Sequence, residues 1–453
     1  MPFRASFYTL GCKLNQLETD AIAEAFAREG ALVRPFASGG DRSEDLVVVN
    51  TCTVTVKADR SARRTIRLAL ETRPRAVVIA TGCYAQVEAG VLSAIDGRVL
   101  ALPGSVKAAL LGLPRRLAES GLLDAGQSDP AALLDFLRGA LAAGADAMAD
   151  PRFAYDPKRF AFHSRPALKI QDGCDNDCAY CRVRIARGPA ASLSAPEVLS
   201  RARALEAAGR AEIVLTGVNL SQYRDGGMAF PGLLGFLLEG TESLAFRVSS
   251  YEPDAIDQAF LDAFAHPRVR PHVHLAVQSG SDPLLRAMGR RYSRSDVLDA
   301  ARALRAFRDE PFIAADLIVG FPGETAEDFA ASLELARDCD FAWIHAFRFS
   351  SRPGTRAASL PDAVPERIAG ERARALFELA LAAKSNYVER WRGRELKAVL
   401  ERDLCATTEN YLKLKPRGLP ESARPGQEIL CRVEGKPEEA ESEPLDAASV
   451  FLG

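Results

Sequence analysis

The chain has 453 residues, of which 47% are hydrophobic and 26% charged, and its formal net charge is −2 at pH 7. This length is too great for one ordinary domain, and the composition is typical of a globular protein with a large apolar core. Because no apolar run is long enough to span a membrane and residues 1–13 lack a signal peptide's apolar stretch, we expect a cytoplasmic protein with no membrane partner.

Residues 1–112 alternate between strand and helix patterns and are predicted to form the first domain. Strands are expected at 2–10, 46–50 and 76–80, and helices at 16–30 and 57–73. Continuous apolar runs separated by helices are typical of a parallel sheet that is covered on both faces. The fold class of this domain is therefore predicted to be α/β.

Three isolated cysteines follow the three predicted strands of this domain. They are Cys12, Cys52 and Cys83. The carboxyl ends of parallel strands meet at one edge of a sheet, where open α/β sheets build their sites. We therefore expect the three thiols to lie close together in space. The alternative interpretation is that they are buried cysteines acting as small hydrophobic residues.

The next segments differ in pattern. Residues 113–163 show no strand pattern and are predicted to be a linker or helical insertion, with one helix at 130–144. From 164 to 391 the alternation resumes, with strands at 165–171, 211–217, 244–250, 272–277, 312–320 and 341–350. Serial strand–helix units predict a full or partial βα barrel with its site at the carboxyl ends of the strands. After a long helix at 365–393, short strand candidates in 392–453 predict a small β-barrel.

A compact cysteine motif follows the first predicted barrel strand. Cys174, Cys178 and Cys181 have the spacing CxxxCxxC, with Tyr180 before the last cysteine. In a reducing compartment, nine cysteines are better explained by metal than by disulfides. Three thiolates can hold three irons of a [4Fe–4S] cluster and leave the fourth iron open to a cofactor. Zinc is the alternative, but structural zinc prefers four ligands in paired sets, and the five histidines of the chain do not form such a set.

The motif and its surroundings resemble the radical S-adenosylmethionine enzymes. Supporting stretches stand where barrel strands end: LTGVNL at 215–220, RVSSYEP at 247–253, AVQSGSD at 276–282 and IVGFPGET at 318–325. The resemblance implies that S-adenosyl-L-methionine contacts Tyr180, Gly217, Glu252 and Gln278. A glycine allows close backbone approach, and a glutamine side chain both donates and accepts hydrogen bonds.

The resemblance extends to one family of that superfamily, the methylthiotransferases. TLGCKLNQLETD, NTCTVT and TGCYAQ around the N-terminal cysteines are similar to the MtaB-type tRNA methylthiotransferases, which act on N6-threonylcarbamoyladenosine. The resemblance covers nearly the whole chain apart from 113–163. It implies two [4Fe–4S] clusters, the first held by Cys12, Cys52 and Cys83 and the second by Cys174, Cys178 and Cys181. One departure is Arg184, where the family usually has a proline.

The resemblance also implies a mechanism and its partners. One S-adenosylmethionine would methylate sulfur on the first cluster, and a second would generate the radical that removes hydrogen from C2 of adenine at tRNA position 37. An electron donor of the flavodoxin or ferredoxin type and a sulfur source are expected, while no side-chain acid or base is nominated. The sequence does not fix the oligomeric state.

Basic residues are expected to bind the tRNA anticodon stem-loop through its phosphates. Residues 286–308 contain seven arginines (286, 290, 291, 294, 302, 305 and 308), and the helix at 57–73 carries Arg60, Arg63, Arg64 and Arg67. Residues 392–436 have ten Lys/Arg against seven Asp/Glu, a local charge of +3, and the resemblance identifies 392–453 as a TRAM-like RNA-binding domain. For any single run of basic residues, the alternative interpretation is a solvent-exposed helix face that does not bind RNA.

Other functions are compatible with these motifs. The same reaction could act on N6-isopentenyladenosine in tRNA or on an aspartate of a ribosomal protein, although KLNQ after Cys12 and CYAQ from Cys83 favour the threonylcarbamoyl branch. A different class is a non-catalytic iron–sulfur protein that binds RNA and senses redox state. Such a sensor would bind tRNA without cleaving S-adenosylmethionine.

Overall fold

The computed structural model describes residues 3–37, 39, 43–122, 129–144, 150–160, 162 and 165–434. The described residues divide into two compact units. The first holds the residues up to 162 together with 182–189, and the second holds 165–181 and 190–434. The acidic tail at 437–453 lies outside the described residues. Of the helices described, none has the length and apolar character that crossing a bilayer requires.

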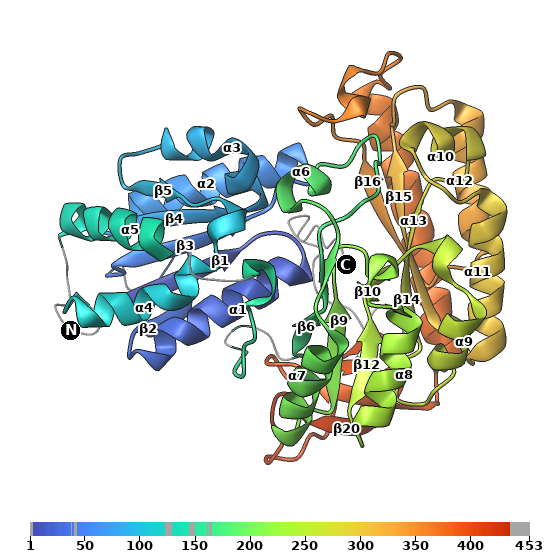
Figure 1. Cartoon of the computed structure of the whole chain (residues 1–453). Helices are drawn as coiled ribbons and strands as arrows, with labels where there is room; N and C mark the ends of the chain where they lie inside the picture. The colour runs from blue at the N-terminus through green and yellow to red at the C-terminus, as the bar shows by residue number, and fades with distance from the viewer. Residues whose placement is uncertain are drawn as a thin grey trace. The chain divides into compact units, whose positions relative to one another are not determined.

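The first unit is built on a parallel sheet. Its strand order is β2 (Leu32–Pro35), β1 (Arg4–Thr9), β3 (Leu46–Thr51), β4 (Val77–Gly82) and β5 (Val99–Ala101). Helices α1 (Lys13–Arg28) and α4 (Ala109–Glu119) lie on one side of the sheet, and α2 (Val56–Thr72) and α3 (Cys83–Ser93) lie on the other (Figure 1). β3 and β4 are buried along their whole length, as the apolar runs at 46–49 and 77–80 predict.

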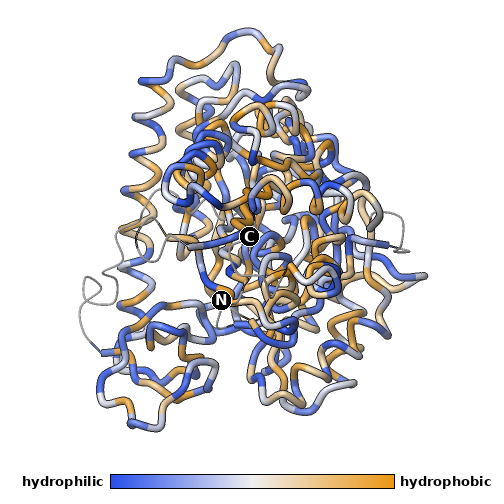
Figure 2. Tube along the Cα trace, turned by 90° about the vertical axis from the view of Figure 1, so that its left-hand side faces the viewer, coloured by the Kyte–Doolittle hydropathy of each residue, from blue (hydrophilic) through white to orange (hydrophobic). Residues whose placement is uncertain are grey.

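The core of this unit follows from helix amphipathicity. The apolar side of α2 packs Ala62, Ile66 and Ala69 against Val47 and Val78 of the sheet. The alternation of apolar and polar residues along such helices can be followed on the chain trace in Figure 2. The helix expected at 130–144 is α5 (Pro130–Gly144), and α4 and α5 both belong to the first unit.

The second unit contains an open barrel of parallel strands. β6 (Ala167–Lys169), β9 (Glu212–Thr216) and β12 (Ala245–Val248) form one part, and β13 (Ser250–Tyr251), β14 (His272–Gln278), β15 (Phe312–Val319) and β16 (Trp343–Arg348) form the other. The connecting helices are α7 (Ala195–Ala207), α8 (Phe230–Gly240), α9 (Gln258–Phe264), α10 (Asp282–Met288), α11 (Arg294–Phe307) and α12 (Ala326–Asp338). The predicted α/β fold with a partial barrel is thereby confirmed.

A small antiparallel sheet follows the long helix α13 (Glu366–Trp391). Its order is β19 (Lys413–Leu414), β18 (Ala406–Thr408), β17 (Glu395–Leu400) and β20 (Glu428–Arg432). Phe312 of β15, Tyr387 and Trp391 of α13, and Leu396 and Leu412 of this C-terminal segment share one apolar core. The C-terminal sheet is therefore packed against the barrel.

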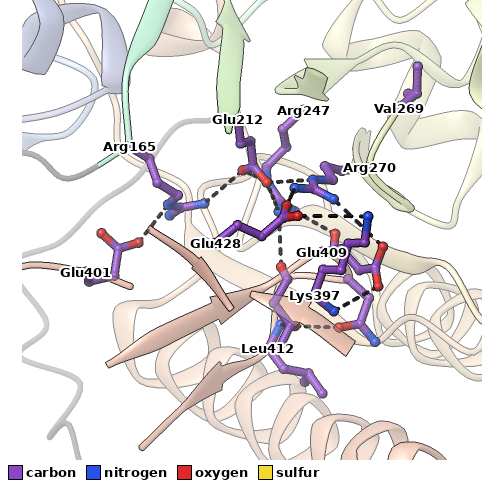
Figure 3. Close-up of polar contacts among 12 residues, drawn as sticks. Arg165, Glu212, Arg247, Val269, Arg270, Lys397, Glu401, Glu409, Leu412 and Glu428 are labelled. Carbon is purple, nitrogen blue, oxygen red and sulfur yellow. Dashed lines mark hydrogen bonds and ion pairs between the residues drawn. The ribbon is translucent and has the colours of Figure 1, made fainter. Parts of the chain in front are cut away.

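Buried charged side chains also connect the barrel to the C-terminal sheet (Figure 3). Glu212 of β9 accepts hydrogen bonds from Arg247 of β12 and from Arg270, which precedes β14. Arg270 also bonds Glu428 of β20 at 2.6 Å. Because an isolated buried charge is costly, these pairs favour one fixed arrangement of the sheet and the barrel.

Candidate functional site

The N-terminal cysteines lie at one edge of the first sheet. Cys12 is the residue before α1, Cys52 follows β3 directly, and Cys83 begins α3 directly after β4. Their strands β1, β3 and β4 are neighbours in the sheet. The expectation that three distant cysteines share the carboxyl edge of this sheet agrees with their positions.

Two glycines allow the strand ends to approach each other. A Cβ atom on Gly11 would lie 2.7 Å from the Cβ of Cys52 and 2.9 Å from its Sγ, and Gly11 has φ +94°. Gly82, with φ +93°, has no room for a Cβ, which would lie 2.5 Å from Oδ1 of Asn50. Since glycine alone tolerates both the backbone angle and the contact, these residues position Cys12 and Cys83 beside Cys52.

Two of these thiols, Cys12 and Cys52, have raised pKa values. Burial raises the pKa of Cys12, and burial together with the nearby Cys83 and Cys12 thiols raises the pKa of Cys52 to about 12. The Arg187 guanidinium acts in the opposite direction and lowers the pKa of both groups. Cys12 and Cys52 thus lie in a buried environment whose cost to the thiolate Arg187 offsets in part.

A buried polar network supports this edge. Asn15 donates to the carbonyls of Leu10 and Thr51, at 2.8 and 3.1 Å, and so links the ends of β1 and β3. Arg187 donates to Asn15 Oδ1 at 2.8 Å and pairs with Glu18 at 3.1 Å. Lys107 also contacts Glu18. Sequence reasoning did not assign these residues, although Asn15 and Glu18 lie within the quoted motif TLGCKLNQLETD.

Arg187 comes from the segment directly after the CxxxCxxC motif. This segment, residues 182–189 with α6 (Val183–Arg187), belongs to the first unit, whereas the sequence-based boundary at 164 placed it with the barrel. Arg182 of the same segment bonds Glu88 of α3 at 3.1 Å. Arg184, the departure from the family pattern, is exposed. Its exposure accounts for why an arginine is tolerated there.

The second cysteine group lies in the loop after β7 (Gln171–Asp172) in the second unit. Cys174 Sγ accepts a hydrogen bond from the Asn176 amide at 3.4 Å, and the Cys181 amide donates to the Cys178 carbonyl at 3.1 Å. Burial raises the pKa of Cys174, and the neighbouring Cys178 thiol raises it further. The loop therefore holds its thiols in a partly buried, hydrogen-bonded turn.

Arg290 is the cation beside this loop. It donates to Cys178 Sγ at 3.2 Å and pairs with the Glu252 carboxylate. Its guanidinium also bonds the Tyr292 hydroxyl at 2.8 Å. Burial raises the pKa of Tyr180 well above its ordinary value, and the nearby Cys178 thiol adds to this rise. Arg290 thus links Cys178 to Glu252 and Tyr292, and Tyr180 lies near the same thiol.

The four residues expected to contact S-adenosylmethionine lie in the second unit. Glu252 accepts from Asn176 and Asn219, both at 3.2 Å, and burial raises its pKa, which Arg290 lowers in part. Gln278 ends β14 with φ +65°, beside a register shift in the sheet. Gly217 is approached by the Gln171 side chain, since a Cβ there would lie 2.8 Å from Gln171 Oε1. Of the four, Tyr180 lies in the cysteine loop itself, and Glu252 accepts a hydrogen bond from Asn176 of that loop.

Several arginines in the run at 286–308 are engaged in contacts within the protein, so only part of the run is exposed for the expected phosphate contacts. Arg290 is buried at the cysteine loop, and Arg294 pairs with Glu334 and Asp338. Arg305 and Arg308 donate to backbone carbonyls. The exposed members are Arg286, Arg291 and Arg302, and on α2 they are Arg60, Arg64 and Arg67. Sequence alone did not separate these two groups because helix ends and loops interrupt the periodicity.

Each cysteine set fits an iron–sulfur cluster in its donor chemistry. Each consists of three thiols with an arginine beside it: Arg187 lowers the pKa of Cys12 and Cys52 in part, and Arg290 donates a hydrogen bond to Cys178 Sγ. Three thiolates leave one iron for a further ligand. The residues present therefore fit the group at both sites.

Comparisons with known proteins match the N-terminal region and the barrel region of the chain to two different families. Residues 4–102 match the family described as "Uncharacterized protein family UPF0004", and residues 168–336 match the Radical SAM superfamily. The chain is 44% identical to "Threonylcarbamoyladenosine tRNA methylthiotransferase MtaB" of Treponema pallidum (strain Nichols), over 91% of this chain and 94% of the relative. It is 33% identical to "tRNA-2-methylthio-N(6)-dimethylallyladenosine synthase" of Sorangium cellulosum (strain So ce56), over 83% and 77%.

Solved structures show the same fold. The chain superposes on the radical S-adenosylmethionine methyltransferase TsrM from Kitasatospora setae, a structure with cobalamin and a [4Fe–4S] cluster bound, with a TM-score of 0.52. The alignment covers 79% of this chain and 77% of TsrM at 16% identity. At this identity the likeness concerns the fold alone.

Proposed function

The chain belongs to the family of MtaB threonylcarbamoyladenosine tRNA methylthiotransferases, and from this premise we propose that it methylthiolates C2 of N6-threonylcarbamoyladenosine at tRNA position 37. Family membership makes the chain a transferase whose cofactors are [4Fe–4S] and S-adenosyl-L-methionine. The substrate, the use of two clusters and the roles of individual residues are parts of the proposal.

The observation that carries the proposal is the pair of separate three-cysteine sets. A radical enzyme that only abstracts hydrogen needs one cluster with an open iron. The additional set, which is the first set at the carboxyl edge of the N-terminal sheet, supports a further step that supplies sulfur. Cys12, Cys52 and Cys83 would hold one cluster, and Cys174, Cys178 and Cys181 would hold the other.

When bound at the second set, the cluster supplies the electron that cleaves S-adenosylmethionine. The protein's own contribution there is to fix charge and exclude water. Arg290 places its positive charge against Cys178 Sγ and at the same time holds the Glu252 carboxylate. Asn176 and Asn219 orient that carboxylate from the other side. A fixed carboxylate suits the amino group or the ribose hydroxyls of S-adenosylmethionine.

At the first set, the chain's own residues fix the strand ends and place one arginine near the thiols. Arg187 reaches Asn15 and Glu18 from the segment after Cys181, and its charge offsets the burial of Cys12 and Cys52. Asn15 fixes the carbonyls of the two strand ends. We assign no side chain as acid or base, because the cofactors carry the difficult steps.

The tRNA anticodon stem-loop is the proposed partner. The exposed arginines of α2 supply phosphate contacts of the sequence-independent kind, and a C-terminal antiparallel sheet supports the TRAM-like assignment of residues 392–453. An electron donor and a sulfur source are required by the reaction and are not identified by any residue described. A cytoplasmic location is the expectation that fits a tRNA substrate.

The experiment that tests the substrate is mass spectrometry of tRNA nucleosides from a deletion strain. We expect the methylthio derivative of threonylcarbamoyladenosine to disappear and to return on complementation. Loss of the methylthio isopentenyl nucleoside instead would favour the nearest alternative, as would an unmethylthiolated ribosomal-protein aspartate. Purified enzyme that binds tRNA but forms no 5′-deoxyadenosine would favour a non-catalytic sensor.

A further inference from the structure

The middle of the cysteine loop in the second unit is held by the turn that ends α10. The Ala179 amide donates to the Met288 carbonyl at 2.9 Å. Two residues further along that turn, Arg290 donates to Cys178 Sγ at 3.2 Å. The loop is thereby bonded to the α10 turn both through its backbone and through the sulfur of one of its cysteines.

Gly289, between these two residues of the turn, allows the close approach. Its φ is +77°, and a Cβ atom on it would lie 2.9 Å from the Asp177 carbonyl oxygen and 3.0 Å from Nη2 of Arg356. Glycine tolerates both this backbone angle and this contact because it has no Cβ. The Asp177 carbonyl, inside the CxxxCxxC motif, is therefore packed directly on the α10 turn.

A second segment contacts the same two loop residues. It is the short 3-10 helix Arg356–Ser359, which follows β16. The Ala357 amide donates to the Ala179 carbonyl at 2.8 Å. Arg356 donates to the Asp177 carbonyl at 2.5 Å and pairs with the Asp177 carboxylate at 3.4 Å. Asp177 and Ala179 are thus each held from both the α10 turn and this helix.

Apolar packing surrounds these hydrogen bonds. One buried core consists of Ala179, Leu284, Met288, Phe321 and Ala357, with Tyr180 and Phe349 packed against it. Both backbone bonds of Ala179 therefore lie in an apolar environment, where a hydrogen bond is stronger than in water. All of these contacts are made by protein groups alone, so they can fix the loop before iron is inserted.

We propose that residues 288–290 and 356–357 form a clasp that positions the cysteine loop for its cluster. This inference rests on the proposed function, in which Cys174, Cys178 and Cys181 are the ligands. A loop whose backbone is already fixed loses less conformational entropy when its thiols bind iron, so the clasp favours retention of the cluster. Gly289 and Arg356 are its positioning residues.

The test uses the full chain with Cys12, Cys52 and Cys83 replaced by alanine, so that only the second set can bind iron. Iron per chain is measured after anaerobic reconstitution, and about four irons are expected. Two further readouts follow: the rate of iron release to EDTA, and the change in the electron paramagnetic resonance spectrum of the reduced protein when S-adenosylmethionine is added. Circular dichroism and thermal unfolding show whether each variant is folded.

Gly289→Ala crowds the Asp177 carbonyl, and Gly209→Ala is its matched control. Gly209 also follows a helix, α7, and has φ +74°, but a Cβ there would meet nothing within 4 Å. Both substitutions impose the same unfavourable backbone angle, so the difference between them reports the contact with the loop. We expect about tenfold faster iron release from Gly289→Ala than from Gly209→Ala, together with a weaker spectral response to S-adenosylmethionine.

Arg356→Ala tests the clasp without straining the backbone, and it keeps the test decisive if Gly289→Ala fails to fold. It removes the hydrogen bond to the Asp177 carbonyl. Because both side chains are more than half exposed, we expect only about two- to threefold faster iron release. Arg367→Ala is the control, since Arg367 pairs with Glu371 at an exposed site on α13, and it should release iron at the background rate.

The outcomes separate this inference from the proposed function. Equal iron release in the two glycine variants, with equal release in the two arginine variants, would overturn the clasp and leave the ligand role of the cysteines intact. If Gly289→Ala does not fold, the arginine pair alone decides in the same way. A background protein that binds no iron would instead contradict the ligand role itself, and the clasp with it.

Discussion

The Arg247 guanidinium forms two parallel hydrogen bonds with the Glu212 carboxylate, Nε to Oε1 at 2.7 Å and Nη2 to Oε2 at 3.0 Å, and both side chains are fully buried. Arg247 also donates to the carbonyls of Thr408 and Glu409 in the C-terminal segment, at 3.0 and 3.1 Å. One bidentate pair thus fixes two barrel strands to each other and to the C-terminal sheet (Figure 3). A sheet fixed in this way is a rigid element on which an RNA-binding surface can be built.

This pair predicts a dependence of stability on acid pH. Although burial opposes ionisation, Arg247 and Arg270 lower the Glu212 pKa from its ordinary 4.5 to about 2. Between these values the unfolded state binds more protons, so the free energy of unfolding falls as pH decreases from about 4.5 to 2, by about 3 kcal/mol from this group. Urea denaturation at several pH values measures it.

Glu212→Gln tests the same pair by substitution. Three arginines would lose their shared anion, and we expect a destabilisation of about 3–5 kcal/mol with a flatter pH dependence below 4.5. Glu197→Gln is the control, because Glu197 pairs with Arg201 at an exposed site. Equal loss of stability in both variants would contradict the role given to Glu212.

Arg290 is predicted to act on S-adenosylmethionine cleavage. Arg290→Ala removes the hydrogen bond to Cys178 Sγ and leaves the buried Glu252 carboxylate without its cation. We expect 5′-deoxyadenosine formation to fall about tenfold or more, since charge-assisted hydrogen bonds are the strong ones. Arg286→Ala, on the exposed side of the same region, should leave the rate unchanged. Normal cleavage in Arg290→Ala would argue against its position in the site.

Arg187 is predicted to support the first cysteine set alone. Arg187→Ala removes the hydrogen bond to Asn15 and the charge that favours thiolate at Cys12 and Cys52. Iron content should decrease from about eight toward about four per chain, while 5′-deoxyadenosine formation persists. Arg184→Ala lies on the same short helix but is exposed, and it should retain all iron. Equal iron loss in the two variants would contradict a specific role.

The exposed arginines of α2 are predicted to contact RNA phosphates. Replacing Arg64 and Arg67 with alanine should weaken tRNA binding and reduce the slope of log K against log salt by roughly 0.7 per lost contact. Arg294→Ala is the control, because Arg294 is held by Glu334 and Asp338. An unchanged salt dependence in the α2 variant would assign those arginines to a solvated helix face.

Much of the fold could be predicted from the sequence because its main signals are long. Long patterns can be recognised, such as the apolar runs of β3, β4 and β15 and the helical period of α2. The sequence did not predict the short strands β2 and β18 or the helix α8, whose patterns are too weak. The cysteine positions followed from topology, since parallel strands end at one edge. Burial of individual charges did not follow: Arg290 and Arg286 look alike in the sequence and differ only in tertiary contacts.

Pairings across the barrel were also beyond the sequence. Asp316 and His345 meet because β15 and β16 pair in one register. A polar residue in an apolar strand is a weak signal by itself. Only the register shows that such residues on neighbouring strands share one face.

The measurement that tests the central claim most directly is iron and sulfide per chain after anaerobic reconstitution. It compares the wild type with two triple alanine variants, one lacking Cys12, Cys52 and Cys83 and the other lacking Cys174, Cys178 and Cys181. Two tetranuclear clusters predict about eight irons in the wild type and about four in each variant. About four irons in the wild type, unchanged when the N-terminal cysteines are removed, would contradict the account and leave sulfur transfer without a site.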